Sequence, residues 1–270
     1  MELSKNQTYG GYVLLFLILA TGSLIAFNML MTLSSRDSNA KELARSAEIE
    51  ITSIAAVGCD SCVDINAIID AVKKQPVQVN KEEQFTMDSE EGKKLVETYQ
   101  ITRAPALLIK GEIEKENVRE FFGTYGRKSE DGTLIIEPKQ PIYFDLAENK
   151  IVGEISLTTI SDSECSECYD PAIHQSILKN NFGVTITKTE ALDANSGQGK
   201  TYVQRYAIKE LPAFLLSGDV TSYDALVKVW EQVGTIEQDG TFVFRGNEKL
   251  SGLVYKDLST GKIVKPETTE

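Results

Sequence analysis

The sequence predicts an α/β protein with two tandem domains behind one N-terminal transmembrane helix. Three observations predict this class: a duplicated series of motifs, strand-like and helix-like segments that alternate within each copy, and a long apolar run near the N-terminus. The 270 residues are enough for two domains and an anchor. The predicted segments are a tail and anchor at 1–35, a juxtamembrane linker at 36–47, and domains at 48–153 and 154–270.

The apolar run covers residues 12–33, and no charged residue lies between Lys5 and Arg36. A run of this length can cross a bilayer as a helix. A cleaved signal peptide is the alternative, but its apolar region would be shorter and a small-x-small cleavage site should follow. No clear site follows here, which favours a retained anchor. The charged linker after it is expected to be helical.

The duplication is clearest at two CxxC motifs, Cys59-Asp-Ser-Cys62 and Cys165-Ser-Glu-Cys168, which contain all four cysteines of the chain. An apolar-flanked proline follows each first cysteine, Pro105 after 46 residues and Pro212 after 47. Other segments match in the same order: 48–54 with 154–160, 92–101 with 199–208, 131–136 with 239–244, and 143–146 with 255–258. Such ordered agreement indicates a tandem duplication.

Within each copy, alternating polar and apolar residues predict strands, and apolar residues at 3.6-residue spacing predict helices. The helix after Cys62 has such a face in Ile65, Ile68, Ile69 and Val72. The first copy is predicted as strand 49–57, helix from 59, strand 84–87, helix 90–99, strand 106–110 and helix 114–122. The second is predicted as strand 155–160, helix after 165, strand 184–187, helix ending at 206, strand 213–216 and helix 223–233. A short β segment with a turn, at 148–150 or 260–262, is expected to close each copy.

The composition argues against some partners. The net charge of −12 disfavours nucleic acid, and the chain has neither a basic cluster nor a glycine-rich phosphate loop. A CxxC pair can interchange between dithiol and disulfide. As a purely structural staple it would do little, because so short a ring barely constrains the unfolded chain. A zinc site of four cysteines is a further alternative, but the two pairs lie in separate repeats, and we expect no metal.

The order of strand, CxxC, strand–helix pair and proline turn resembles the thioredoxin fold over about residues 48–124 and 154–233. The tandem pair resembles the double-thioredoxin disulfide oxidoreductases and, more distantly, the protein disulfide isomerases. The resemblance implies exposed nucleophiles at helix starts, buried resolving thiols, and cis-prolines that border a substrate groove. The implied nucleophiles are Cys59 and Cys165, the resolving thiols Cys62 and Cys168, and the groove residues Ala104, Pro105, Leu211 and Pro212.

The resemblance also implies a membrane-anchored thiol–disulfide oxidoreductase that needs no cofactor. Its partners would be protein thiols or disulfides and an unidentified redox partner. Three departures favour an alternative, a non-catalytic thioredoxin-like binding module with structural disulfides. Pro171 lies three residues after Cys168, earlier than the family's helix-kinking proline. Gly58 and Glu164 replace the usual aromatic residue before the first cysteine, and Ser53 and Thr159 replace the buried acid that accepts a proton.

An anchor that carries dithiol domains suits an oxidising space, so we expect the domains to be extracytoplasmic. The positive charges that follow the apolar run, Arg36, Lys41 and Arg45, favour the opposite orientation.

The second motif is expected to form the less stable thiolate. Asp162, Glu164 and Glu167 surround it, and like charges disfavour a thiolate. Asp170-Pro171 can also restart the helix there, which would remove helix-dipole support from Cys165 but not from Cys59. The only histidine, His174, is expected to have a surface or packing role, and the only tryptophan, Trp230, is expected to lie in the core.

Overall fold

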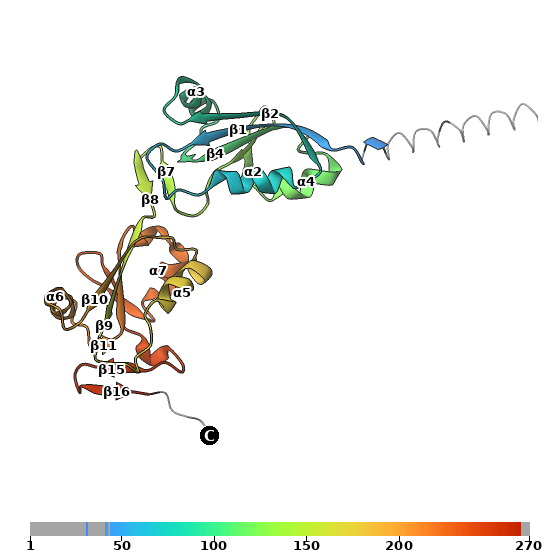
Figure 1. Cartoon of the computed structure of the whole chain (residues 1–270). Helices are drawn as coiled ribbons and strands as arrows, with labels where there is room; N and C mark the ends of the chain where they lie inside the picture. The colour runs from blue at the N-terminus through green and yellow to red at the C-terminus, as the bar shows by residue number, and fades with distance from the viewer. Residues whose placement is uncertain (1–30, 32–40, 43, 266–270) are drawn as a thin grey trace, which may run out of the picture.

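The computed structural model describes residues 31, 41–42 and 44–265, and the two repeats form two five-stranded sheets of the same strand order (Figure 1). The first sheet has the order β2-β1-β4-β6-β5 and the second β10-β9-β12-β14-β13. The strands of the first sheet are β1 Ala47–Ala55, β2 Val77–Thr86, β4 Ala106–Gly111, β5 Arg127–Lys128 and β6 Leu134–Ile136. Those of the second are β9 Ile155–Ser161, β10 Ile186–Asp193, β12 Ala213–Gly218, β13 Gly234–Ile236 and β14 Phe242–Phe244.

The first strand of each repeat pairs in parallel with one neighbour and antiparallel with the other. β1 runs parallel to β2, and β9 runs parallel to β10. On their other edges β1 pairs antiparallel with β4, and β9 with β12. A parallel pair requires a crossover connection, which α2 (Ile65–Lys73) supplies in the first repeat and α5 (Ile173–Phe182) in the second.

Helices cover both faces of each sheet (Figure 1). In the first repeat α2 and α4 (Glu116–Gly123) pack on one face, and α3 (Glu90–Thr98) packs on the other. In the second, α5 and α7 (Asp224–Trp230) share a face, and α6 (Gly197–Arg205) covers the opposite one. The three inner strands of each sheet therefore contribute alternate side chains to two separate cores. Trp230 is 1% exposed in one of these cores, as expected.

Each repeat adds a small three-stranded sheet to this plan. The first contains β3 (Arg103–Ala104), β7 (Tyr143–Asp145) and β8 (Lys150–Val152), in the order β3-β7-β8. The second contains β11 (Glu210–Leu211), β15 (Tyr255–Asp257) and β16 (Lys262–Val264), in the order β11-β15-β16. The predicted terminal β segments are thus hairpins. They pair with the short strand just before each proline rather than standing apart.

Several predicted boundaries are wrong. The first helix begins at Ile65 rather than Cys59, because the Asp64 carboxylate accepts the Asn66 N–H and caps it there. β2 begins at Val77, seven residues earlier than predicted, and β10 ends six residues later than predicted. The strands β5, β6, β13 and β14 were not predicted, although β6 and β14 are short, wholly apolar runs.

The predicted anchor at 12–33 lies outside the described residues, except for Met31. Among the residues that the structure does describe, none forms a helix long and apolar enough to span a membrane.

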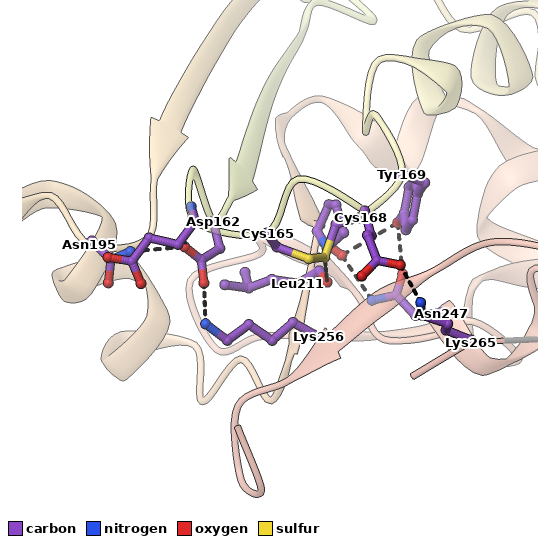
Figure 2. The surroundings of a disulfide bond; sticks show 12 residues. Asp162, Cys165, Cys168, Tyr169, Asn195, Leu211, Asn247, Lys256 and Lys265 are labelled. Atoms are coloured by element: carbon purple, nitrogen blue, oxygen red, sulfur yellow. Dashed lines mark hydrogen bonds and ion pairs between the residues drawn. A yellow bond between two sulfur atoms is a disulfide. The ribbon is translucent and has the colours of Figure 1, made fainter. Parts of the chain in front are cut away.

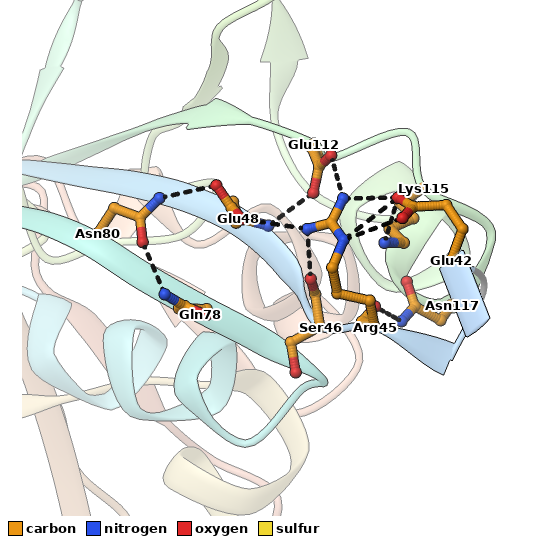
Figure 3. Close-up of polar contacts among 9 residues, drawn as sticks. All are labelled: Glu42, Arg45, Ser46, Glu48, Gln78, Asn80, Glu112, Lys115 and Asn117. Atoms are coloured by element: carbon orange, nitrogen blue, oxygen red, sulfur yellow. Dashed lines mark hydrogen bonds and ion pairs between the residues drawn. The ribbon is translucent and has the colours of Figure 1, made fainter. Parts of the chain in front are cut away.

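The segment before β1 is fastened to the first domain by an ion-pair cluster (Figure 3). The Arg45 guanidinium lies 2.6 Å from Glu42 and 2.7 Å from Glu112. Glu112 also accepts the backbone N–H of Glu48 at 2.9 Å, and Lys115 lies 3.1 Å from Glu42. Arg45 lowers the pKa of both Glu42 and Glu112 to about 2. The end of the linker is therefore attached at the start of β1.

A glycine at the third position of α3 and of α6 lets each helix pack against the preceding strand. Ser196 accepts the Gly199 N–H at 2.9 Å as a helix cap, and a Cβ on Gly199 would overlap the Asp193 carbonyl oxygen. Ser89, Gly92 and Thr86 repeat this arrangement in the first domain.

We therefore expect Gly199→Ala to destabilise the second repeat by about 1–3 kcal/mol, the usual cost of overpacking. Gly197→Ala is the matched control on the same helix. A Cβ there meets nothing within 4 Å, and alanine favours helix. Urea unfolding followed by Trp230 fluorescence measures both. Equal unfolding midpoints for the two variants would contradict this packing.

Candidate functional site

The two CxxC motifs form disulfides at equivalent positions, just beyond the ends of β1 and β9. Cys59 is bonded to Cys62, and Cys165 to Cys168, with Cα–Cα distances of 5.4 Å in both. Both motifs are turns that precede a helix. The prediction that Cys59 and Cys165 stand at helix N-termini is therefore wrong. In the second repeat Asp170 accepts the Ala172 N–H at 2.9 Å, but α5 begins at Ile173 with Ala172 as its N-cap. Asp170-Pro171 is therefore part of the turn before the helix and not the helix start that was expected.

Each disulfide lies beside a proline turn. The Ala104–Pro105 and Leu211–Pro212 peptide bonds are cis, as expected from their positions in the repeat. In the second site Cys168 Sγ lies 3.9 Å from the carbonyl oxygen of Leu211. The structure therefore brings the CxxC turn and the proline turn together, although about forty residues separate them along the chain.

The exposure of the cysteines differs between the sites. Cys165, the implied nucleophile of the second motif, is 8% exposed, whereas Cys168 is half-buried. This order is the reverse of that expected for an exposed nucleophile and a buried resolving thiol. Cys59 and Cys62 are both half-buried. The implied nucleophile of the first motif, Cys59, is therefore more exposed than Cys165, its counterpart in the second.

The terminal hairpin of each repeat bridges the CxxC turn and the proline turn. Ala104 pairs with Phe144, and Leu211 pairs with Lys256. The residue after each motif is held as well. Val63 N–H donates to Ile142 O, and Tyr169 N–H donates to Val254 O, both at 2.9 Å. The backbone edges of Ala104 and Leu211, predicted to face a substrate strand, are occupied by the chain's own hairpins in this structure.

Lysines from the second hairpin neutralise two of the three acidic neighbours of the second motif (Figure 2). Lys256 forms an ion pair with Asp162, and Lys265 forms one with Glu167. The Lys256 contact lowers the pKa of the buried Asp162 carboxyl. The less stable Cys165 thiolate was expected from three nearby negative charges, and two of these are neutralised by lysines. The helix-dipole reason fails too, because neither motif begins a helix.

The first motif has a different neighbour. Ser61, inside the motif, donates to the Glu154 carboxylate at 3.0 Å. Glu154 lies between the last strand of the first repeat and the first strand of the second. The first site is therefore next to the junction of the two repeats.

A buried polar network supports the second site. The Tyr169 hydroxyl donates to Asn247 Oδ1 at 2.7 Å and lies 2.9 Å from His174 Nε2. Asn247 Nδ2 donates to the Pro212 carbonyl at 2.9 Å. These contacts join the residue after Cys168 to the cis-proline turn. The first repeat has Val63 in place of Tyr169, so it lacks this network.

Burial shifts the pKa values in this network. It lowers the pKa of His174 to about 4, so the imidazole is neutral at pH 7. Burial, and to a lesser extent Glu210, raises the pKa of Tyr169. His174 is 3% exposed and packs against Phe214 and Phe244, so of the two roles expected from the sequence it has the packing role.

Tyr169, Asn247 and Lys256 belong to the site but were not predicted from the sequence. One signal was available: Tyr-Lys-Asp-Leu at 255–258 departs from Tyr-Phe-Asp-Leu at 143–146 at Lys256 alone. The structure also shows which contacts are made by the two residues that replace the buried acid. Ser53 and Thr159 donate to the backbone carbonyls of Glu83 and Glu190 in the neighbouring strands, at 3.5 and 3.4 Å. Within the described residues, no group of three or more histidine, cysteine or acidic side chains is arranged to hold a metal ion.

No protein-family model matches the chain, and no curated protein does. Among solved structures, it is similar to ERdj5 form I, with 8% identity and a TM-score of 0.19 over 68% of this chain and 25% of that one. Full-length ERdj5 has 8% identity and a TM-score of 0.20, over 81% of this chain and 29% of that one. Human ERp44 has 10% identity and a TM-score of 0.19, over 79% of this chain and 95% of that one. The chain thus spans about a quarter of the ERdj5 structures. From its own geometry, each repeat is a mixed α/β unit that resembles thioredoxin-like folds.

The buried neutral His174 predicts a pH-dependent stability of the second repeat. Its folded pKa of about 4 lies below the ordinary value of 6.5, so between these values the unfolded chain binds a proton that the folded one does not. Stability therefore falls as pH drops from about 6.5 to about 4, by at most about 3 kcal/mol. Urea unfolding followed by Trp230 fluorescence at pH 7 and pH 5 should show this loss. His174→Gln, which cannot titrate, should show less of it, and an equal loss would contradict the assignment.

Proposed function

We propose that this protein is a thiol–disulfide oxidoreductase that acts on protein thiols or disulfides. One observation carries the proposal. Two CxxC disulfides lie at matching places in duplicated folds, each just beyond the first strand of its repeat, which pairs with the strand that follows a cis-proline. A short ring of this kind adds little stability, so its repetition beside a proline turn is better explained by reversible chemistry.

The reaction needs only the cysteines. In the reducing direction, the Cys59 thiolate attacks one sulfur of a substrate disulfide, and the other substrate sulfur leaves as a thiolate that takes up a proton. The Cys62 thiolate then attacks Cys59 Sγ and releases the second substrate thiol. Two electrons pass from the motif to the substrate, and the motif ends as the disulfide seen here. The oxidising direction is the reverse. Cys165 and Cys168 would have the same roles in the second site.

The proposal includes an anchor at residues 12–33, with both domains on the extracytoplasmic side. An oxidising space keeps such disulfides available for exchange. A separate redox partner would return each motif to its starting state.

A second candidate is a non-catalytic binding module with structural disulfides. Two observations favour it. The chain's own hairpins pair with the edges beside both prolines, and Ser53 and Thr159 are engaged with backbone carbonyls instead of offering a proton acceptor.

The two candidates differ in the behaviour of single-cysteine variants of the full-length chain in detergent. An oxidoreductase should reduce a disulfide-bonded protein substrate when supplied with dithiothreitol. Cys59→Ser should lower the contribution of the first site by about a hundredfold or more, because the attacking thiolate is lost. Cys62→Ser should instead trap a mixed disulfide through Cys59, visible on a non-reducing gel.

Alkylation of the reduced chain at neutral pH should also label Cys59 before Cys62. Two results would contradict the oxidoreductase and favour the binding module: no turnover by the unmodified chain, or turnover that is unchanged when all four cysteines are replaced.

A further inference from the structure

The second terminal hairpin, β15–β16, lies across the second CxxC site. Its strand β15 pairs with Leu211, the residue before the cis-proline. The Val254 carbonyl, just before β15, accepts the N–H of Tyr169, just after the motif, at 2.9 Å. Cys165, inside the motif, is 8% exposed. The hairpin thus joins the CxxC turn to the proline turn and pairs with the residue whose backbone was predicted to face a substrate strand.

Two lysines fasten this hairpin to the motif (Figure 2). Lys256 on β15 reaches Asp162, whose side chain is 3% exposed and whose backbone carbonyl accepts the Cys165 N–H at 3.0 Å. Lys265, just beyond β16, pairs with Glu167 inside the motif. The Glu167 pair is largely exposed and contributes little. Lys256 is the principal fastener, because its partner carboxylate is buried.

The apolar attachment of the hairpin is limited to partly buried residues, of which Leu258 in the turn packs against the core. All three residues of β15 are only half-buried, and Lys262 and Ile263 on β16 are exposed. Only two residues of β15 pair with β11. Segments with few buried contacts open at low free-energy cost, so the ion pairs carry a large share of the attachment.

The first repeat is fastened differently. Phe144 stands in place of Lys256, and Gly153 in place of Lys265. Its hairpin is held from the second repeat, since Gly153 N–H donates to Asp219 at 3.0 Å and the Tyr223 hydroxyl donates to the Gly153 carbonyl at 2.8 Å. The lysine attachment is therefore specific to the second site.

We propose that the β15–β16 hairpin is a cover of the second site, closed by Lys256 on Asp162 and, more weakly, by Lys265 on Glu167. A protein partner reaches the Cys165–Cys168 disulfide only when the cover lifts. This inference rests on the proposed function, because the partner is a protein dithiol. One partner thiolate attacks one sulfur of the Cys165–Cys168 disulfide, the bond between the two motif sulfurs breaks, and the other motif sulfur leaves as a thiolate that takes up a proton. The partner's second thiolate then attacks the partner sulfur of this mixed disulfide and releases the second motif cysteine as a thiol. Two electrons enter the motif, and the partner leaves oxidised. A small dithiol passes beside the hairpin and does not require the opening.

The test uses the full-length chain in detergent with Cys59→Ser and Cys62→Ser, so that only the second disulfide remains. Its reduction is timed with a reduced thioredoxin as the protein dithiol and with dithiothreitol as the small one. Lys256→Gln should raise the rate with thioredoxin by about tenfold, because it releases the half-buried ion pair, and the rate with dithiothreitol by less than about twofold.

Lys262→Gln is the matched control. It removes the same charge from the same hairpin, at an exposed position that makes no ion pair among the described residues, and should leave both rates unchanged. Because Lys256→Gln leaves Asp162 buried without its partner, the double variant Asp162→Asn with Lys256→Gln is included. It should show the same increase, while Trp230 fluorescence stays that of the folded repeat. Backbone hydrogen exchange at residues 255–257 should be faster in Lys256→Gln and in the double variant than in the chain that keeps Lys256.

Equal thioredoxin rates for Lys256→Gln and Lys262→Gln would overturn the cover. So would an increase of the same size with both reductants, because it would reflect a change at the sulfur atoms instead of access. Either result leaves the proposed function open, since that depends on turnover of a protein substrate by the chain with Cys59 and Cys62 intact.

Discussion

The pairing of a two-residue strand with a terminal hairpin is the contact on which the rest of each site depends. β3 and β11 immediately precede the cis-prolines, and their edges would be unpaired without β7 and β15. Because buried backbone groups must be hydrogen-bonded, the hairpin satisfies these strands and also holds the residue after each CxxC motif. One element thereby sets the distance between disulfide and proline turn, and it also limits access to both.

The two copies keep this plan but support it with different side chains. In the first, Arg127 donates to the carbonyls of Tyr99 and Gln100 at the end of α3 and pairs with Glu137. In the second, Arg245 donates to the equivalent carbonyls of Tyr206 and Ala207 and pairs with Glu237. Arg245 occupies the position that matches Glu137, whereas Glu237 matches Ser129 and Arg127 matches Thr235. The ion pair is thus built from different positions in the two copies, while the helix end remains capped. Function can diverge between the sites in the same way, through Lys256 and Tyr169.

The attachment of the linker bears on how a membrane-anchored form would present its sites. Arg45 fixes the linker at the start of β1, and the first motif follows the end of that strand. A nine-residue strand spans about 30 Å. An anchor before the linker would therefore hold the first disulfide about that far from the point of attachment, facing away from it and toward the second repeat, where Ser61 meets Glu154.

The sequence by itself determined the duplication, the α/β class of each copy, the pairing of each CxxC motif with a later proline, and most helices and strands of the core. These follow from local periodicity and from the repeat, which are written along the chain. The tertiary structure alone decided that the hairpins cover the proline strands, that Asp162 is neutralised by Lys256, and that Cys165 is the buried member of its pair. These depend on contacts between residues some 45 to 95 positions apart, and the charge or burial of a side chain is set by such neighbours, which no local pattern contains.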